Sequence, residues 1–228
     1  MASCNWIGSI CRCVGVSLAA ALATTVFADE LPYYNSADFT PHWFASAADV
    51  PTDFHEIPAF QFANQFGATV TDQDVAGKVY VASFFFSTCP GICPAIRSKL
   101  SRVQERFAGD DGVRILAHSI RPETDSVAVL QAYADDNAID GRFWHLLTGD
   151  RNTLHALARS AYFANEDLGE EQSEKDFLHT ENLLLIDANR RIRGVYNGLS
   201  RSSVEHLIND IVVLRRNTPT TTLAVDAE

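Results

Sequence analysis

This sequence has few cysteines, little positive charge and no long hydrophobic run in its main body. Its 228 residues include five cysteines, too few for a fold built on disulfides. Eighteen Lys and Arg against 29 Asp and Glu give a net charge of −11, which argues against nucleic-acid binding. A content of 46% hydrophobic and 21% charged residues is typical of a globular protein, not of a disordered or collagen-like chain. We expect one globular domain with short flanking segments and no internal repeats.

Residues 1–28 resemble a secretory signal peptide. They carry one charged residue, Arg12, and an apolar stretch of about 14 residues, short of the ~20 that span a bilayer. Small residues before Asp29 suit cleavage after Ala28. The region before the apolar stretch is less basic than in a typical signal peptide, so a retained membrane anchor is the alternative. We therefore expect an exported protein that contacts the membrane only if this anchor is retained, and we expect a monomer.

Cleavage at this point would leave Cys89 and Cys93 as the only cysteines in a chain of 200 residues. A structural disulfide between them would close a very small ring and remove little entropy from the unfolded chain. We therefore interpret the pair as chemically active.

The rest of the chain predicts a layered α/β fold. Residues 29–57 are expected to form an arm over the domain of residues 58–217, and residues 218–228 a flexible tail. Strands alternate with amphipathic helices, and Asp125 or Ser126 caps one helix and Asp150 another. The predicted strands and turns are a hairpin at 60–71, buried strands at 79–86, 113–120 and 143–147, and a hairpin at 183–196; an acidic loop covers 165–176.

Residues 87–94 carry the chemistry, because they lead from a buried strand into a helix. A thiol at a helix N-terminus is expected to have a lowered pKa, and thiolates are the nucleophilic and metal-binding form. Three residues separate Cys89 from Cys93, against two in redox enzymes of the thioredoxin type. This spacing permits a disulfide, but it also allows both sulfurs to bind one soft ion. Two thiolates favour Cu(I), and an added imidazole extends the site to Cu(II).

A third ligand would come from the seven histidines. His179 stands out because it ends the acidic loop just before the strand at 183–186, and in a parallel sheet that loop can lie beside the cysteines. Four others are expected to have structural roles: His155 and His206 in helices, and His118 and His145 in strands. The sequence assigns no role to His42 and His55, which lie in the arm.

Two blocks of the sequence resemble the Sco/SenC family. The first is residues 84–94 (FFFSTCPGICP), and the second runs from His179 through residues 191–196 (RIRGVY). The resemblance covers roughly residues 55–215. It implies a thioredoxin-like three-layer sandwich and a periplasmic or mitochondrial copper protein that helps to assemble the CuA centre of cytochrome c oxidase. It also implies copper ligation by Cys89, Cys93 and His179.

The sequence departs from the family pattern near these blocks. Leu178 stands where family members often carry Asp, and Arg121 opens a segment that usually reads Asp-Pro-Glu. The three implied ligands are present, but the groups around them differ, and such groups tune the affinity and potential of a metal site.

Three functions are compatible with these residues. The first is a copper metallochaperone that passes copper to the CuA-containing subunit of the oxidase or to another acceptor. The second is a thiol–disulfide reductase of that subunit's cysteines, with Cys89 attacking and Cys93 resolving. No proline stands near Thr180, where thioredoxin-type reductases carry a cis-proline, which weakens general reductase activity. The third is a peroxidase on the same fold, for which Arg97 gives faint support.

Overall fold

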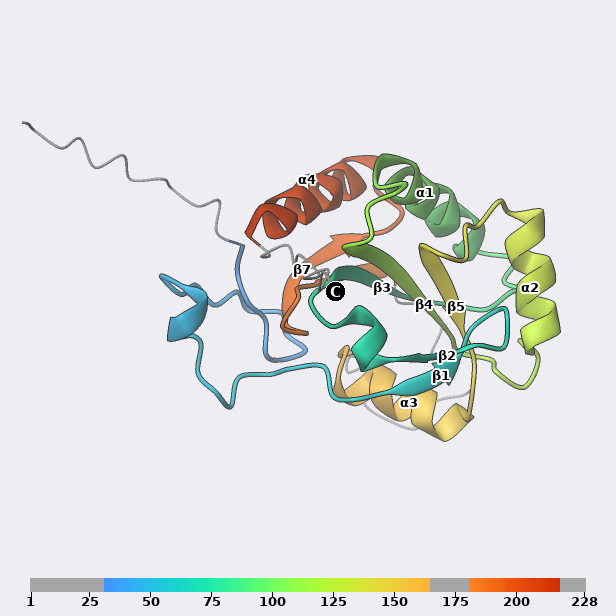
Figure 1. The fold of residues 1–228 in the computed structure, drawn as a ribbon, viewed down its shortest axis with the longest axis horizontal. Coiled ribbons are helices and arrows are strands. Elements are labelled where there is room, and N and C mark those ends of the chain that lie inside the picture. The colour runs from blue at the N-terminus through green and yellow to red at the C-terminus, as the bar shows by residue number, and fades with distance from the viewer. Residues whose placement is uncertain (1–30, 165–180, 218–228) are drawn as a thin grey trace, which may run out of the picture.

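The computed structural model describes residues 31–164 and 181–217 (Figure 1). The signal peptide, the acidic loop, His179 and the tail predicted above lie outside these ranges. The strands are β1 (Gln61–Ala63), β2 (Thr69–Thr71), β3 (Val79–Phe85), β4 (Val113–Ser119), β5 (Trp144–Leu147), β6 (Asn182–Ile186) and β7 (Ile192–Asn197). The helices are α1 (Cys93–Arg106), α2 (Val127–Asp136), α3 (Arg151–Ser160) and α4 (Arg201–Asn217), with 3-10 turns η1 (Ala47–Asp49) and η2 (Asp72–Val75).

Five strands form the main sheet in the order β5-β4-β3-β6-β7, and β1 and β2 form a separate hairpin. β3 lies at the centre, and all seven of its residues are buried, as expected for an apolar run covered on both faces. β3, β4 and β5 are parallel, whereas β6 is antiparallel to β3, and β7 to β6. The predicted hairpins at 60–71 and 183–196 are confirmed.

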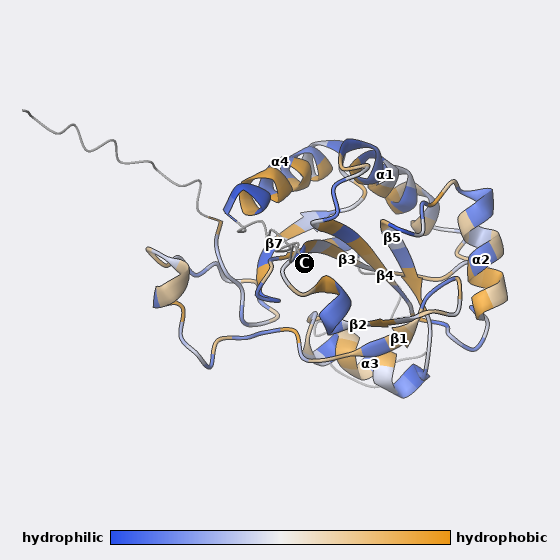
Figure 2. Ribbon diagram, in the orientation of Figure 1, coloured by the Kyte–Doolittle hydropathy of each residue, from blue (hydrophilic) through white to orange (hydrophobic). Residues whose placement is uncertain are grey.

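Helices cover both faces of this sheet. α1 and α4 lie together on one side, and α3 with the β1–β2 hairpin lies on the other (Figure 1). Alternate residues of β3 face the two sides: Ser83 and Phe85 point toward α1, while Tyr80 and Phe84 contact Tyr162 beyond α3. Apolar residues concentrate on the strands and on the inward helix faces (Figure 2). This is the predicted three-layer α/β arrangement.

The direction of β6 corrects our expectation of a parallel sheet around the cysteine loop. Ala82 of β3 pairs with Leu184 of β6, and the two strands run in opposite directions. The beginning of β6 therefore lies at the edge of the sheet where β3 ends. A parallel β6 would have begun at the opposite edge, so the antiparallel pairing is what brings the start of β6 to the cysteine end.

Two predicted helix caps are present. The Ser126 side chain accepts a hydrogen bond from the Val129 amide at 3.4 Å, and the Asp150 carboxylate accepts one from the Thr153 amide at 2.8 Å. Each bond satisfies an amide that the first helical turn leaves unpaired. The cap of α2 is thus Ser126, and Asp125 is available for another role.

The chain before β1 packs along β7, the edge strand of the sheet. The Tyr34 amide donates to the Ile192 carbonyl at 3.1 Å. Arg193 places its guanidinium 3.6 Å from the centre of the Tyr33 ring and forms a 3.1 Å ion pair with Asp187. These contacts cover an edge that would otherwise expose unpaired backbone groups.

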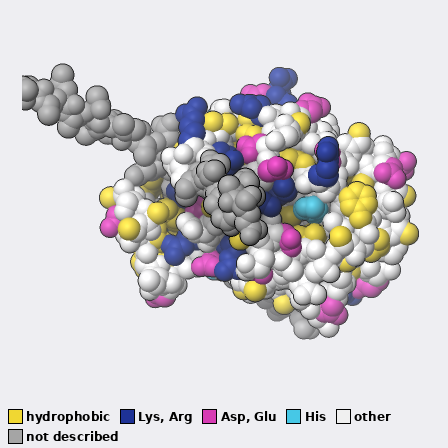
Figure 3. Space-filling model, in the orientation of Figure 1, with side chains coloured by type: hydrophobic (Ala, Val, Ile, Leu, Met, Phe, Trp, Pro, Cys, Tyr) yellow, Lys and Arg dark blue, Asp and Glu magenta, His cyan; other side chains and the backbone are white. Residues whose placement is uncertain are grey.

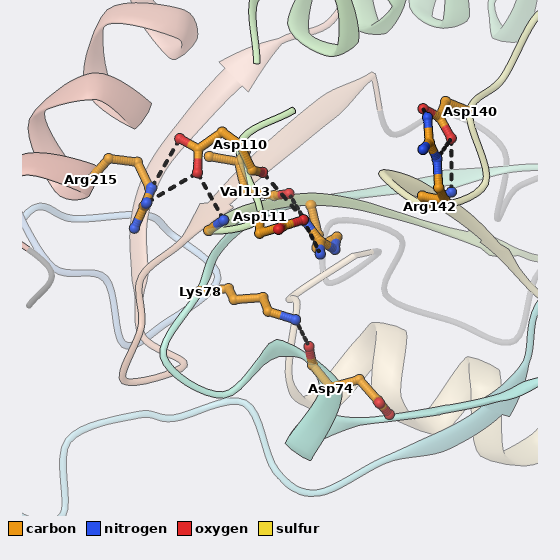
Figure 4. A network of polar contacts seen from close by, with 10 residues as sticks. Asp74, Lys78, Asp110, Asp111, Val113, Asp140, Arg142 and Arg215 are labelled. Atoms are coloured by element: carbon orange, nitrogen blue, oxygen red, sulfur yellow. Dashed lines mark hydrogen bonds and ion pairs between the residues drawn. The ribbon is translucent and has the colours of Figure 1, made fainter. Parts of the chain in front are cut away.

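Charged side chains close the end of the sheet opposite the cysteines. Asp110 accepts hydrogen bonds from Arg215 at 3.0 and 3.2 Å and from the Gly112 amide at 2.8 Å, which ties the end of α4 to the start of β4 (Figure 4). On the visible surface, Lys and Arg side chains gather along the rim formed by α4 and α1 (Figure 3). No helix in the described ranges combines the length and apolar composition needed to cross a bilayer.

Candidate metal and thiol site

The two cysteines lie where β3 gives way to α1. Cys89 is half-buried in the connecting loop, and its amide donates to the Phe86 carbonyl at 3.2 Å. Cys93 is the first residue of α1 and is 9% exposed. Pro94 follows it in the first turn, where a missing N–H leaves no hydrogen bond unmade. Both cysteines are free thiols.

A buried carboxylate holds the start of this loop. Asp125 is fully buried, and its oxygens accept hydrogen bonds from the Ser87 hydroxyl at 2.5 Å and the Ser119 hydroxyl at 2.6 Å. The Ser87 amide also donates to both oxygens, at 3.2 and 3.3 Å. Asp125 therefore links the end of β4 to the cysteine loop at Ser87, which precedes Cys89 by two residues. The sequence analysis identified Asp125 only as a possible helix cap and gave no signal for this buried network.

Arg121 flanks the same loop from the β4 side. Its guanidinium lies 4.3 Å from the centre of the Phe86 ring. Such a cation–ring contact helps to fix the orientation of both side chains. The sequence drew attention to Arg121 only as a departure from Asp-Pro-Glu, and gave no signal for this contact.

The pKa of Cys93 contradicts the prediction from helix position. Burial, together with the neighbouring Cys89 thiol, raises the pKa of Cys93 to about 12. Removing the thiolate from water outweighs the favourable field of the helix N-terminus. Cys93 is therefore a protonated thiol in the metal-free protein, and binding a metal requires the release of this proton.

A small cavity lies behind Cys93, between α1 and the sheet. Its volume is about 20 Å³, enough for one water molecule. Polar groups in its wall come from Ser83, Arg97, Tyr133 and Trp144, and apart from Cys93 the six other lining residues are apolar. Ser83 Oγ, Trp144 Nε1 and Arg97 Nε are buried there without a hydrogen-bond partner.

The described histidines do not complete a metal site with the cysteines. Within residues 31–164 and 181–217, no group of three or more His, Cys, Asp or Glu side chains is arranged to hold a metal ion. His118 is buried among aromatic rings, and His155 bonds the Ile120 carbonyl at 3.0 Å. His118 and His155 thus have the structural roles that the sequence predicted for them.

Glu181, the first described residue after 165–180, lies near the first turn of α1. Glu181 accepts a hydrogen bond from the Gly198 amide at 2.8 Å. A Cβ atom placed on Gly198 would lie 2.9 Å from the Glu181 carbonyl oxygen and 3.3 Å from Cγ1 of Ile96. Gly198 therefore allows a close approach between the start of β6 and the first turn of α1, the turn that carries Cys93.

This arrangement defines a class of protein. A central sheet of parallel and antiparallel strands, with a pair of cysteines between its central strand and the following helix, is a thioredoxin-like fold with a wider cysteine spacing. The family model of SCO1/SenC matches residues 49–214. The chain belongs to this family, as the sequence motifs predicted.

Individual relatives agree with this assignment. The SCO1 protein homolog of Bacillus subtilis strain 168 is 25% identical over 159 residues, covering 69% of this chain and 81% of the relative. BsSco, described as a member of the Sco family of cytochrome c oxidase assembly proteins with a disulfide switch, superposes with a TM-score of 0.61 at 25% identity, over 71% and 94% of the two chains. ScoI of Bradyrhizobium japonicum, solved with copper bound, shares the fold at a TM-score of 0.55 and 23% identity, over 69% and 98%.

Proposed function

We propose that this protein is a copper metallochaperone that binds one copper ion through Cys89, Cys93 and His179. The observation that carries the proposal is that β6 begins at the edge of the sheet where β3 ends and the cysteine loop starts. His179 precedes Glu181 by two residues, and two extended residues span about 7 Å. Glu181 itself approaches the first turn of α1. A segment this short would allow the His179 imidazole to reach the thiols.

The donor set suits copper. Two thiolates select soft ions such as Cu(I), and an imidazole adds a nitrogen that Cu(II) takes readily. The copper-bound relative supports this choice of metal. We propose delivery to the CuA-containing subunit of cytochrome c oxidase, because BsSco is described as an oxidase assembly protein. Residues 1–28 would export the chain to the periplasm, either as a cleaved signal or as a retained anchor.

A second function, reduction of the acceptor's disulfide, is favoured by the unequal exposure of the two thiols. Cys89 is half-buried and accessible, whereas Cys93 is buried behind it. The Cys89 thiolate would attack the acceptor disulfide and release one acceptor thiolate. Cys93 would then displace the second thiol and form the Cys89–Cys93 disulfide, so that two electrons pass to the acceptor. The described peptide bonds include no cis-proline of the kind that general reductases use.

Copper titration tests the first proposal. The Cu(II) complex is expected to show intense sulfur-to-copper charge-transfer absorption, one equivalent per monomer. His179→Ala is expected to weaken Cu(II) binding more than Cu(I) binding, because Cu(I) tolerates two-coordinate thiolate ligation. His206→Ala, on an exposed position of α4, is the matched control and leaves both affinities unchanged. Absence of the charge-transfer bands in reduced, copper-loaded protein would overturn the proposal.

Single serine variants separate the two functions. Cys89→Ser and Cys93→Ser are each expected to abolish copper delivery to a reduced CuA-domain acceptor, because one thiolate and one imidazole hold Cu(I) poorly. The wild type is expected to reduce generic disulfides slowly. Reduction at a thioredoxin-like rate, or delivery by either serine variant at the wild-type rate, would place the reductase function first.

A further inference from the structure

Arg97 carries the positive charge in the wall of the cavity behind Cys93. It follows Cys93 by four residues, so the two side chains lie one turn apart on the same face of α1. Both line the cavity, together with Tyr133 of α2. No aspartate or glutamate lines this cavity, so its wall contains a guanidinium and a thiol but no carboxylate.

Arg97 has no counter-ion among the described residues, although it lies in the wall of a buried cavity. Arg102, further along α1, pairs with Glu205 at 3.1 Å, and Arg215 of α4 pairs with Asp110 at 3.0 Å. No carboxylate in the described part of the chain pairs with Arg97, and its Nε is buried without a hydrogen-bond partner. A partly buried charge is costly unless an opposite charge lies nearby. The position therefore favours an anion that forms beside it.

The other polar groups near the cysteines do not provide this anion. Asp125 forms no ion pair with Arg97, and its two oxygens instead accept hydrogen bonds from Ser87 and Ser119. Burial raises the pKa of Tyr133, in spite of the opposing effect of Arg97, so its phenol remains neutral. Cys93 is the group in this wall that becomes anionic, and it does so when a metal displaces its proton, while Cys89, its hydrogen-bonded neighbour, lies outside the wall.

We propose that Arg97 is the counter-charge of the Cys89–Cys93 thiolate pair and thereby biases the site toward Cu(I) over Cu(II). The inference rests on the proposed function. Two thiolates give a net charge of zero with Cu(II) and of −1 with Cu(I), and a neutral third ligand changes neither value. Gain of one electron by bound Cu(II) therefore creates the negative charge that the guanidinium stabilises. Removing Arg97 destabilises the Cu(I) state selectively and leaves the ligands in place.

The test measures both copper affinities and the potential of the bound copper. Cu(I) and Cu(II) dissociation constants are determined on purified protein by competition with chelators of each ion, and the potential by redox titration. For Arg97→Gln we expect the ratio of Cu(I) to Cu(II) affinity to fall about tenfold, the size of one charge acting through a partly solvated, screened site. For a one-electron couple this lowers the potential by about 59 mV. Arg97→Lys, which keeps the charge, retains the wild-type ratio.

Arg106→Gln is the matched control, because Arg106 is exposed at the far end of the same helix. It leaves the ratio unchanged. A circular dichroism melt checks that each variant folds, and Arg97→Met, whose side chain suits the apolar wall, carries the same expectation if Arg97→Gln does not fold. Folded variants lacking the charge that bind copper with the wild-type ratio would overturn the role of Arg97. A wild-type protein that binds no copper would instead overturn the proposed function.

Discussion

At the scale of single residues, Cys89 and Cys93 lie in different surroundings although only three residues separate them. Cys93 occupies the first position of α1, where the helix field favours a thiolate, yet burial raises its pKa to about 12. Cys89 is the more exposed thiol. The pair therefore offers one accessible sulfur for capture and one buried sulfur for retention. This division would suit both of the proposed functions, metal carriage and disulfide reduction.

Asp125 is the residue on which the geometry of the cysteine loop depends. Asp125→Ala leaves the Ser87 amide and two buried hydroxyls without their acceptor, so we expect the free energy of unfolding to fall by about 3 kcal/mol. Asp125→Asn keeps one acceptor oxygen, so its free energy of unfolding should fall by less. Urea denaturation measures both, with the exposed Asp135→Ala of α2 as the control. Equal losses for Asp125→Ala and Asp135→Ala would show that the network contributes nothing.

His118 makes the stability of the protein depend on pH. Burial lowers the pKa of His118 to about 4, and of His145 also to about 4 with the help of Arg114. In the unfolded chain a histidine titrates near 6.5, so between pH 6.5 and 4 the unfolded state binds protons that the folded state does not. The contribution of these two neutral histidines to stability is fully present above pH 6.5 and is lost as the pH falls toward 4.

We expect each histidine to add a slope of up to about 1.4 kcal/mol per pH unit in this window. His118→Phe keeps an aromatic ring between Phe62 and Phe84 but cannot titrate. Its unfolding free energy between pH 6.5 and 5 should therefore depend on pH about half as steeply as that of the wild type. An unchanged slope would assign the dependence to other groups.

At the scale of secondary-structure elements, β7 depends on the segment that precedes β1. Arg193 of β7 donates to the carbonyl oxygens of Leu31 at 2.6 Å and Pro32 at 3.0 Å, and pairs with the buried Asp187. One side chain thus holds the segment before β1 and the turn between β6 and β7. The contact joins parts of the chain that are more than 150 residues apart.

Arg193→Ala should therefore act on two elements at once. Removing the partner of a buried carboxylate is expected to lower the free energy of unfolding by about 3 kcal/mol. Hydrogen exchange at the Tyr34 amide, which bonds the Ile192 carbonyl, should accelerate beyond the global change. The exposed ion pair of Arg201 with Glu205 provides the control, since Arg201→Ala should lower the free energy of unfolding by less than about 0.5 kcal/mol. Comparable effects of the two substitutions would contradict this role.

At the scale of the whole molecule, the apolar pattern predicted most of the layered fold. The buried run at 79–86 became the central strand β3, and the helical spacing after Cys93 became α1, because burial on one or two faces dictates these periods. The direction of β6 was not predictable from its sequence. The apolar run of four residues in β6, Leu183 to Ile186, is equally compatible with a parallel and an antiparallel sheet.

The site shows the same division between local and tertiary information. The spacing of Cys89 and Cys93 and their place at the start of a helix were predicted, because both are local properties. The raised pKa of Cys93, the hydrogen bonds of Asp125 and the cavity at Arg97 depend on packing between α1, α2 and the sheet, which no local pattern encodes. The role of His179 as a ligand remains a prediction.

X-ray absorption at the copper edge of the Cu(I)-loaded protein tests the central claim most directly, since it identifies the atoms bound to the metal. We predict two sulfur neighbours and one imidazole nitrogen for the wild type, and two sulfur neighbours without that nitrogen for His179→Ala. A copper ion with no sulfur neighbour, or an unchanged imidazole signal in His179→Ala, would contradict the account.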